Sequence, residues 1–377
     1  MKFRFPILFA AALFLLVGSA FGKVNTKEEL ARQAVSDDAS KSVEAVRELR
    51  FLGQEGMDAL FTAFAGEIKT FSETGRETGN WKKIAFALDT VAMQKDAYAS
   101  RLYWYTNLDE AKRVADTANK PIISLRLLGN LNEEFSCANS RLFRAVLYPN
   151  ADIAKYLREN YILHWESVRP APRITIDFGD GRRIERTLTG NSIHYILDEN
   201  GTIIDALPGL YSPKAFLKYI TQGGAINKIV DGLPKAKQAS GLMRYRKTSY
   251  DEIKAKRDKG VEISGVRLTE PKAGTIAILA APMATAKMLV VDEYSILRVF
   301  DDFAKFEPAI NFDDWNKLAK LYSPSLKLDA NSIAFIRRQN AKTGLTEDEF
   351  SQLFAKLDSF IALDTTRNDF VFPMKPS

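Results

Sequence analysis

Apolar residues recur at helical spacing through most of the first hundred residues. Val43, Val46 and Leu49 are three apart, and a similar run resumes after Gly53. Because this spacing places apolar side chains on one face of a helix, residues 23–103 are predicted to form a helical N-terminal region. The break at Gly53 divides one helix–turn–helix pair, which is similar to a single HEAT-like unit. A solenoid requires several such repeats, so one pair does not predict one.

Between residues 104 and 222 helical and extended patterns alternate. Amphipathic stretches at 107–120 and 150–161 predict helices, and apolar runs rich in strand formers at 121–128 and 162–168 predict strands. A further helix is expected to begin near Cys137. This alternation predicts an α/β domain with a mixed central sheet.

Two strand–turn–strand patterns follow in the same region. Residues 173–188 alternate around a Gly-Asp-Gly turn, and residues 192–209 alternate around Asn200-Gly201. Both are typical of β-hairpins. Capping patterns mark three helix starts: Thr26 with Glu29, Thr346 with Glu349, and Ser212 followed by Pro213.

The C-terminal region, 223–377, is predicted to be mainly helical. Helical spacing is present over 276–303, 312–322 and 329–341, and no chemistry can be assigned to these segments. Two helical regions on either side of an α/β domain suggest a clamp over the Cys137 helix or a platform for a partner.

The N-terminus has the layout of a secretory signal peptide. Lys2 and Arg4 precede an apolar run, and Ala20 and Gly22 are small residues suited to cleavage after residue 22. The protein is therefore predicted to be exported, to a periplasmic or extracellular location. No later segment is long and apolar enough to predict a stable membrane span after cleavage.

The charge is close to balanced. The chain has 53 Lys and Arg against 47 Asp and Glu, a net charge of +6 that falls to +4 without Lys2 and Arg4. No basic stripe with base-reading groups is evident, so nucleic-acid binding is not predicted. The basic runs at 244–247 and 254–259 are interpreted as a solvated helix face.

Several of these elements resemble the thioredoxin-like superfamily. The residues that carry the likeness are Lys120-Pro121 with the strand after it, the C-x-x-S motif Cys137-Ala138-Asn139-Ser140, the helix and strand at 153–165, and the hairpin at 195–204. The closest likeness is to the exported branch that contains the anterior gradient proteins and similar C-x-x-S domains. The resemblance covers about a third of the chain and implies a thioredoxin-like fold for 104–222, with the insertion 173–188.

The resemblance also implies a role for Cys137, the one cysteine of the chain. At the start of a helix, unpaired backbone N–H groups favour the thiolate form, and Arg141 on the same helical face acts in the same direction. Ser140 is expected to donate a hydrogen bond from its hydroxyl to the thiolate. Cys137 lies off the apolar face of its helix, which argues against simple burial.

The same likeness places a substrate groove at Asn191 and Ser192, beside the cysteine. The family usually has a cis-proline at the position of Ser192, and a cis bond before serine would cost about 2.5–4 kcal/mol. A trans bond is therefore expected here.

Two functions remain open. With no second cysteine, a dithiol cycle within one molecule is excluded, but Cys137 could carry monothiol thiol–disulfide exchange with a protein or a low-molecular-weight thiol. The alternative is a redox-inactive module that binds a protein partner. No cofactor is predicted, and no metal either, because Cys137, His164 and His194 lack the spacing of a ligand set.

Overall fold

The computed structural model describes residues 25–187, 192–264, 317, 319–320, 328–341 and 343–371. The predicted signal peptide, the predicted helix at 276–303 and most of the one at 312–322 lie outside these residues. Within the described ranges no helix combines the length and apolarity needed to cross a membrane.

The N-terminal helical region is confirmed. Its elements are α1 (Lys27–Gln33), α2 (Ala39–Phe51), α3 (Gln54–Ala63), α4 (Ala65–Thr74), α5 (Trp81–Ala92) and η1 (Ala97–Ala99). Gly53 has φ 65°, a left-handed conformation that favours glycine, and it separates α2 from α3 as the sequence predicts.

All three predicted helix starts are confirmed. The Thr26 hydroxyl accepts from Glu29 N while Glu29 accepts from Thr26 N, a complete capping box at α1. The same exchange joins Thr346 and Glu349 at the start of α15 (Glu347–Val371). Ser212 caps α9 (Pro213–Asp231), which starts with proline. This helix runs on to Asp231, so the predicted boundary at 222 falls inside it.

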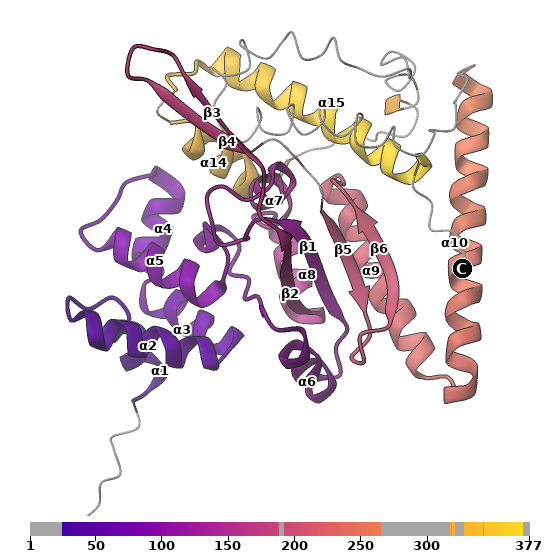
Figure 1. Ribbon diagram of the computed structural model, residues 1–377, viewed down its shortest axis with the longest axis horizontal. Coiled ribbons are helices and arrows are strands. Elements are labelled where there is room, and N and C mark those ends of the chain that lie inside the picture. The colour runs from indigo at the N-terminus through magenta and orange to yellow at the C-terminus, as the bar shows by residue number, and fades with distance from the viewer. Residues whose placement is uncertain are drawn as a thin grey trace, which may run out of the picture.

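The centre of the molecule is a mixed four-stranded sheet in the order β2-β1-β5-β6 (Figure 1). Its strands are β1 (Ile122–Leu128), β2 (Ile162–Arg169), β5 (Ile193–Leu197) and β6 (Ile203–Pro208). β1 pairs in parallel with β2 and antiparallel with β5, and β5 pairs antiparallel with β6. The predicted α/β architecture with a mixed sheet and helical regions on both sides along the chain is confirmed.

Helices cover both faces of the sheet. On one face α6 (Leu108–Ala118) packs over Ile122 and Leu197. The other face carries α8 (Ala151–Asn160) and α9, and it contains Ile123 and Leu125 within the main core. This alternation of neighbouring residues along β1 is the period-two pattern of a strand buried on both faces.

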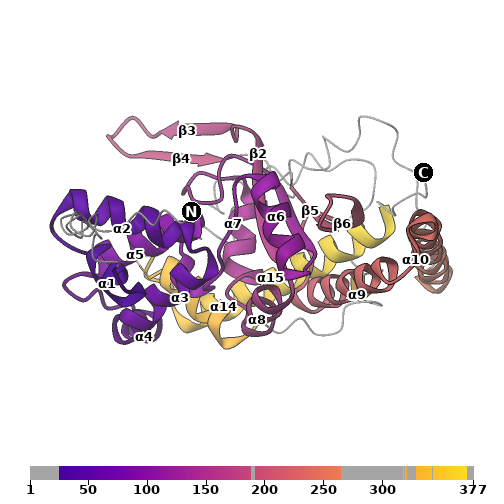
Figure 2. The ribbon, with the colours of Figure 1, turned by 90° about the horizontal axis from the view of Figure 1, so that it is seen from below.

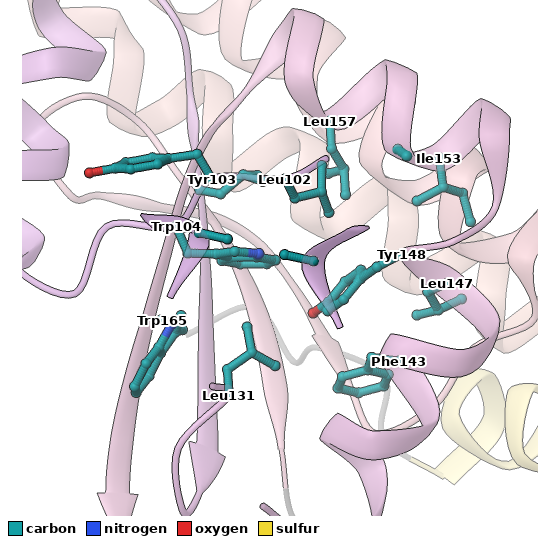
Figure 3. Packing of buried hydrophobic residues seen from close by; sticks show 14 of the residues in the cluster. Leu102, Tyr103, Trp104, Leu131, Phe143, Leu147, Tyr148, Ile153, Leu157 and Trp165 are labelled. Carbon is teal, nitrogen blue, oxygen red and sulfur yellow. The ribbon is translucent and has the colours of Figure 1, made fainter. Parts of the chain in front are cut away.

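The main core continues from the sheet into the N-terminal helices. Trp104 and Tyr148 are fully buried, with ring centres 5.2 Å apart, and Phe143 lies beyond Tyr148 (Figure 3). Trp104 Nε1 donates to Gln94 Oε1 at 2.8 Å, so its polar atom is satisfied within the core. The N-terminal helices and the α/β unit therefore share one hydrophobic core.

The predicted hairpin at 173–188 is confirmed as β3 (Arg173–Asp177) and β4 (Arg183–Thr187). These strands form a separate two-stranded sheet that projects from the body of the molecule (Figures 1 and 2). At its base, Thr187 Oγ1 donates to Ser136 O at 2.9 Å, which ties the hairpin to the loop before Cys137.

The C-terminal helix α14 (Ala330–Gln339) returns to contact both earlier regions. Asp329 caps α14 by accepting from Ser332 N at 2.9 Å, and its other oxygen accepts from Ala151 N at 2.7 Å. The Ser332 hydroxyl donates to Val146 O at 3.4 Å. Near the other end of α14, Arg338 Nη1 donates to Ser72 O, and Arg338 Nε donates to Tyr98 Oη at 3.3 Å. One short helix thus joins the N-terminal region to the α/β unit.

Replacing Arg338 with glutamine is expected to lower the free energy of unfolding by about 2 kcal/mol. The change removes two hydrogen bonds that the charged guanidinium donates. It also removes the contact between the guanidinium and the Tyr98 ring, whose centre lies 5.6 Å from the guanidinium carbon. Chemical denaturation followed by tryptophan fluorescence measures the change.

Arg337→Gln is the matched control, one position away on the same helix. Arg337 pairs with the largely exposed Glu347 at 2.7 and 2.8 Å. Its guanidinium carbon lies 4.5 Å from the centre of the Phe350 ring, so both variants lose a contact with an aromatic ring. An exposed pair contributes less than about 1 kcal/mol. Equal losses in the two variants would contradict the role assigned to Arg338.

Candidate functional site

Cys137 is held by the backbone at the junction of a strand-following loop and a short helix. It is the N-cap of α7 (Ala138–Leu142), which continues as η2 (Phe143–Leu147). Cys137 N donates to Leu128 O at 3.0 Å, so the last residue of β1 anchors the start of this helix. The predicted position of the cysteine at a helix start is confirmed.

The neighbours of the sulfur differ from the prediction. The backbone N–H of Ser140 donates to Cys137 Sγ at 3.4 Å, as in an N-cap. The Ser140 hydroxyl donates instead to Cys137 O at 2.8 Å. The expectation that the Ser140 hydroxyl donates to the sulfur is therefore wrong. In the first turn of the helix the Cys137 carbonyl, three residues earlier, is the nearer acceptor.

The expectation that Cys137 avoids burial is also wrong. Its exposed fraction is 0%, and every residue of α7 and η2 is buried. The base of the hairpin closes over Ser136, and α14 packs against η2. Segments remote in the sequence therefore cover the faces of the Cys137 helix that its own sequence leaves polar.

Arg141 and Arg144 are buried beside the cysteine helix. Arg141 is 2% exposed, and burial, followed by the nearby Arg144 charge, lowers the pKa of its guanidinium to about 9. Arg144 Nη1 lies 3.3 Å from Asp96 Oδ2, in an ion pair with the N-terminal region. The predicted proximity of Arg141 to Cys137 is present, but this arginine faces no solvent through which a thiol substrate could arrive.

Tyr148 and His194 form a buried pair on the face of the sheet that carries α8 and α9. A hydrogen bond of 2.9 Å joins Tyr148 Oη to His194 Nε2, and the His194 ring packs against Phe143 and Phe216. Burial raises the pKa of Tyr148 well above its usual value, and Cys137 acts in the same direction. Burial lowers the pKa of His194 to about 3, so this histidine is neutral at physiological pH.

The predicted substrate groove is not open at Ser192. Ser192 is 6% exposed, and its carbonyl accepts from Gly209 N at 2.9 Å. Asn191, and with it the peptide bond expected to be trans, lies outside the described residues. Among the described residues, the hydroxyls of Ser136 and Ser192 have no hydrogen-bond partner. Ser192, the described residue of the predicted groove, is therefore buried.

The two histidines are on opposite faces of the sheet. His164 Nδ1 lies 2.9 Å from the Ser124 hydroxyl, and burial together with Arg126 lowers the pKa of His164 to about 4. No group of three or more His, Cys, Asp or Glu residues suited to a metal is present in the part of the chain that the structure describes. Cys137, His164 and His194 therefore do not form a ligand set.

The sequence patterns did not predict a second site, which lies in the N-terminal helical region. A cleft of about 420 Å³ lies between α5, η1 and α14, and its lining includes Trp81, Tyr98, Asp89, Asp96 and Arg338. Burial, followed by the charge of Asp96, raises the pKa of Asp89 to about 6. Lys95 lies 3.4 Å from Asp89 and 3.7 Å from Asp96. No local signal marks Asp89, since it occupies an ordinary polar position of an amphipathic helix.

Comparison of the chain with protein-family models, with curated proteins and with solved structures finds no match.

Proposed function

We propose that this protein is a redox-inactive interaction module of the exported compartment, built on a thioredoxin-like α/β unit between two helical regions. The complete burial of Cys137 is the observation that carries this proposal. Thiol–disulfide exchange requires a thiolate to reach a disulfide sulfur in line, and a sulfur with no exposed surface offers no approach.

The chain order supports a thioredoxin-like unit. A strand, the cysteine helix, a second helix and a parallel strand are followed by an antiparallel pair and a closing helix. This is the order that the C-x-x-S resemblance implies. The likeness concerns the fold, and function is argued here from the site alone.

Exposed apolar side chains support an interaction role. Phe51 on α2 is 90% exposed, Phe86 on α5 is 69% exposed, and Phe178 at the tip of the projecting hairpin is 40% exposed. A partner protein would bury such side chains on binding, and aromatic residues are enriched in protein interfaces. Export follows from the predicted signal peptide.

Native Cys137 is expected to react with iodoacetamide about a hundredfold more slowly than an exposed thiol. Reaction requires an opening of the α7 region, because the closed state offers no exposed sulfur. The rate is measured by mass spectrometry in the native protein and again in denaturant, where the protection should vanish.

A matched reference thiol makes this measurement decisive. Ser40→Cys in a Cys137→Ser background places one cysteine at an exposed position of α2. Equal labelling rates for Cys137 and this reference would overturn the redox-inactive proposal.

Monothiol exchange remains the second candidate, and one observation favours it. Cys137 Sγ accepts a backbone N–H at a helix start, with two arginines in the same helical segment. If α14 were displaced, this sulfur would be a suitable nucleophile for a mixed disulfide with a protein or a small thiol. Trapped disulfide adducts that disappear in Cys137→Ser would establish this function.

A further inference from the structure

The basic residues of this chain are unevenly placed. Residues 213–249 contain eight Lys or Arg and a single acidic residue, Asp231, whereas the whole chain has 53 basic and 47 acidic residues. This stretch forms α9 and the first half of α10 (Lys235–Ser264). The near-neutral chain therefore carries a strongly basic segment in one part of the fold.

α9 divides cleanly into a packed face and a cationic face. Phe216 and Ile220 are buried toward the sheet, together with Gly223, whose missing side chain leaves room for Ile196 of β5. Lys214 and Lys218 are exposed on the opposite side, and Lys228 lies on the same side further along. Helical spacing places the three lysines on the face opposite the packed apolar residues, and this explains their exposure.

Several side chains attach α10 to the rest of the molecule. Leu242 is buried, Tyr245 Oη donates to Asp205 Oδ2 at 2.7 Å, and Arg246 donates to Ile203 O. Lys237 and Lys247 lie on the exposed side. Arg246 thus points at the protein itself, and Lys218 of α9 lies over the ring of its neighbour Tyr219, with 5.5 Å between Nζ and the ring centre.

The other seven cations define the basic surface. Among the described residues none of them forms an ion pair, although exposed lysines elsewhere, such as Lys41 and Lys69, do pair with acidic neighbours. The seven residues of the basic surface are Lys214, Lys218, Lys228, Lys235, Lys237, Arg244 and Lys247. Their charge is available to an external anion.

Two apolar side chains interrupt the basic surface. Ile229 is 62% exposed and Met243 is 40% exposed, each next to a member of the surface in the sequence. Figures 1 and 2 both place α10 at the end of the molecule opposite α1–α5, where none of the described elements covers its outer side. Clusters of Lys and Arg on exposed helices are typical of segments that bind an anionic lipid surface.

We propose that the basic surface of α9 and α10 docks the protein on an anionic lipid membrane, with Ile229 and Met243 entering the headgroup layer. Six of the seven cations are lysines, which act as point charges and suit a fluid array of headgroups. A nucleic acid would favour stacking aromatics or bidentate arginines, and the surface has one arginine. This inference is independent of the proposed interaction function and of Cys137.

The processed protein is expected to co-sediment with vesicles of phosphatidylglycerol and phosphatidylcholine, but not with phosphatidylcholine alone. Binding should weaken as salt is added, because the lysines are exposed. The triple variant Lys214→Gln, Lys218→Gln, Lys228→Gln should bind at least about tenfold more weakly, since each lysine near an anionic surface contributes roughly fivefold.

The matched control is Lys41→Gln, Lys69→Gln, Lys82→Gln, which has the same net charge but changes exposed residues at the other end of the molecule. It should bind as the wild type does. Equal losses in the two triple variants, or no preference for anionic vesicles, would overturn the proposal.

A second pair of measurements separates a lipid surface from other polyanions. Ile229→Ser with Met243→Ser should weaken vesicle binding severalfold and leave heparin binding unchanged, because only a membrane rewards apolar insertion. Binding to DNA or heparin without binding to vesicles would assign the surface to another class of partner and reject the lipid proposal.

Discussion

Acidification from about pH 7 to pH 4 is expected to destabilise the folded protein by about 3 kcal/mol through His194 alone. The folded-state pKa of His194 is about 3, against an ordinary value of 6.5. Between these values the unfolded chain binds a proton and the folded chain does not. Stability is therefore complete above about pH 6.5 and is lost as the pH falls.

The local structure explains why this histidine resists protonation. It is fully buried between Phe143 and Phe216, and Tyr148 supplies its one hydrogen bond. No carboxylate contacts the ring among the described residues, so a charged imidazole would lie uncompensated in the core.

Asp89 acts in the opposite direction. Its folded-state pKa of about 6 means that the folded protein binds a proton before the unfolded chain does, so Asp89 stabilises the fold as the pH falls from about 6 to 4. His164, with a pKa of about 4, acts in the same direction as His194. The contribution of His194 must therefore be measured as a difference between variants.

The double variant His194→Phe, Tyr148→Phe isolates this contribution. It replaces the polar pair by rings that can pack among Phe143 and Phe216 and leaves no hydroxyl without a partner. Urea unfolding at pH 7 and pH 4 should show about 3 kcal/mol less acid destabilisation than the wild type. Tyr148→Phe alone keeps His194 and should keep the acid response. If the double variant loses stability on acidification as the wild type does, the assignment to His194 is wrong.

Gly56→Ala is expected to destabilise the protein by about 3 kcal/mol or more. A Cβ at Gly56 of α3 would lie 1.9 Å from Leu49 O and 2.7 Å from Leu49 C in α2. Both are backbone atoms, so the clash cannot be relieved by rotating a side chain. The two helices must move apart, and Leu49, Met57 and Leu60 would then lose packing in the core.

Gly66→Ala provides the matched control in the neighbouring helix α4. A Cβ at Gly66 meets no atom within 4 Å, so this variant should be more stable by about 0.5–1 kcal/mol, as alanine is in a helix. Thermal or urea unfolding should show changes of opposite sign in the free energy of unfolding of the two variants. A mild effect of Gly56→Ala, similar in size to that of Gly66→Ala, would mean that α2 and α3 are not packed as closely as described.

Local signals predicted much of the architecture. The capping pairs Thr26–Glu29 and Thr346–Glu349 form because donor and acceptor are three residues apart, whatever the rest of the chain does. The hairpin at 173–188 and the strands of the sheet follow from period-two patterns and glycine turns in the same way. The end of α9 was missed because Gly223 and Gly224 follow residue 222 as local helix breakers. In the structure both glycines are buried inside the helix, where Gly223 packs against Ile196.

The candidate site was predictable only in part. The sequence placed Cys137 correctly as the first residue of a helix after a strand, because that position depends on a few neighbouring residues. Its burial depends on Thr187, which reaches back to Ser136, and on Ser332, which reaches back to Val146. Those contacts span 51 and 186 residues, and no pattern near the cysteine encodes them.

The sequence by itself determined where helices and strands begin, which of their faces are apolar, and that one thiol has no partner for a disulfide. The tertiary structure alone decided that Cys137 is covered, that His194 and Asp89 have shifted pKa values, and that the seven cations of α9 and α10 remain exposed. The reason is physical: helix capping and periodicity are interactions between residues a few positions apart. Exposure and electrostatic environment are instead sums over all surrounding atoms, and most of those atoms belong to segments distant in the chain.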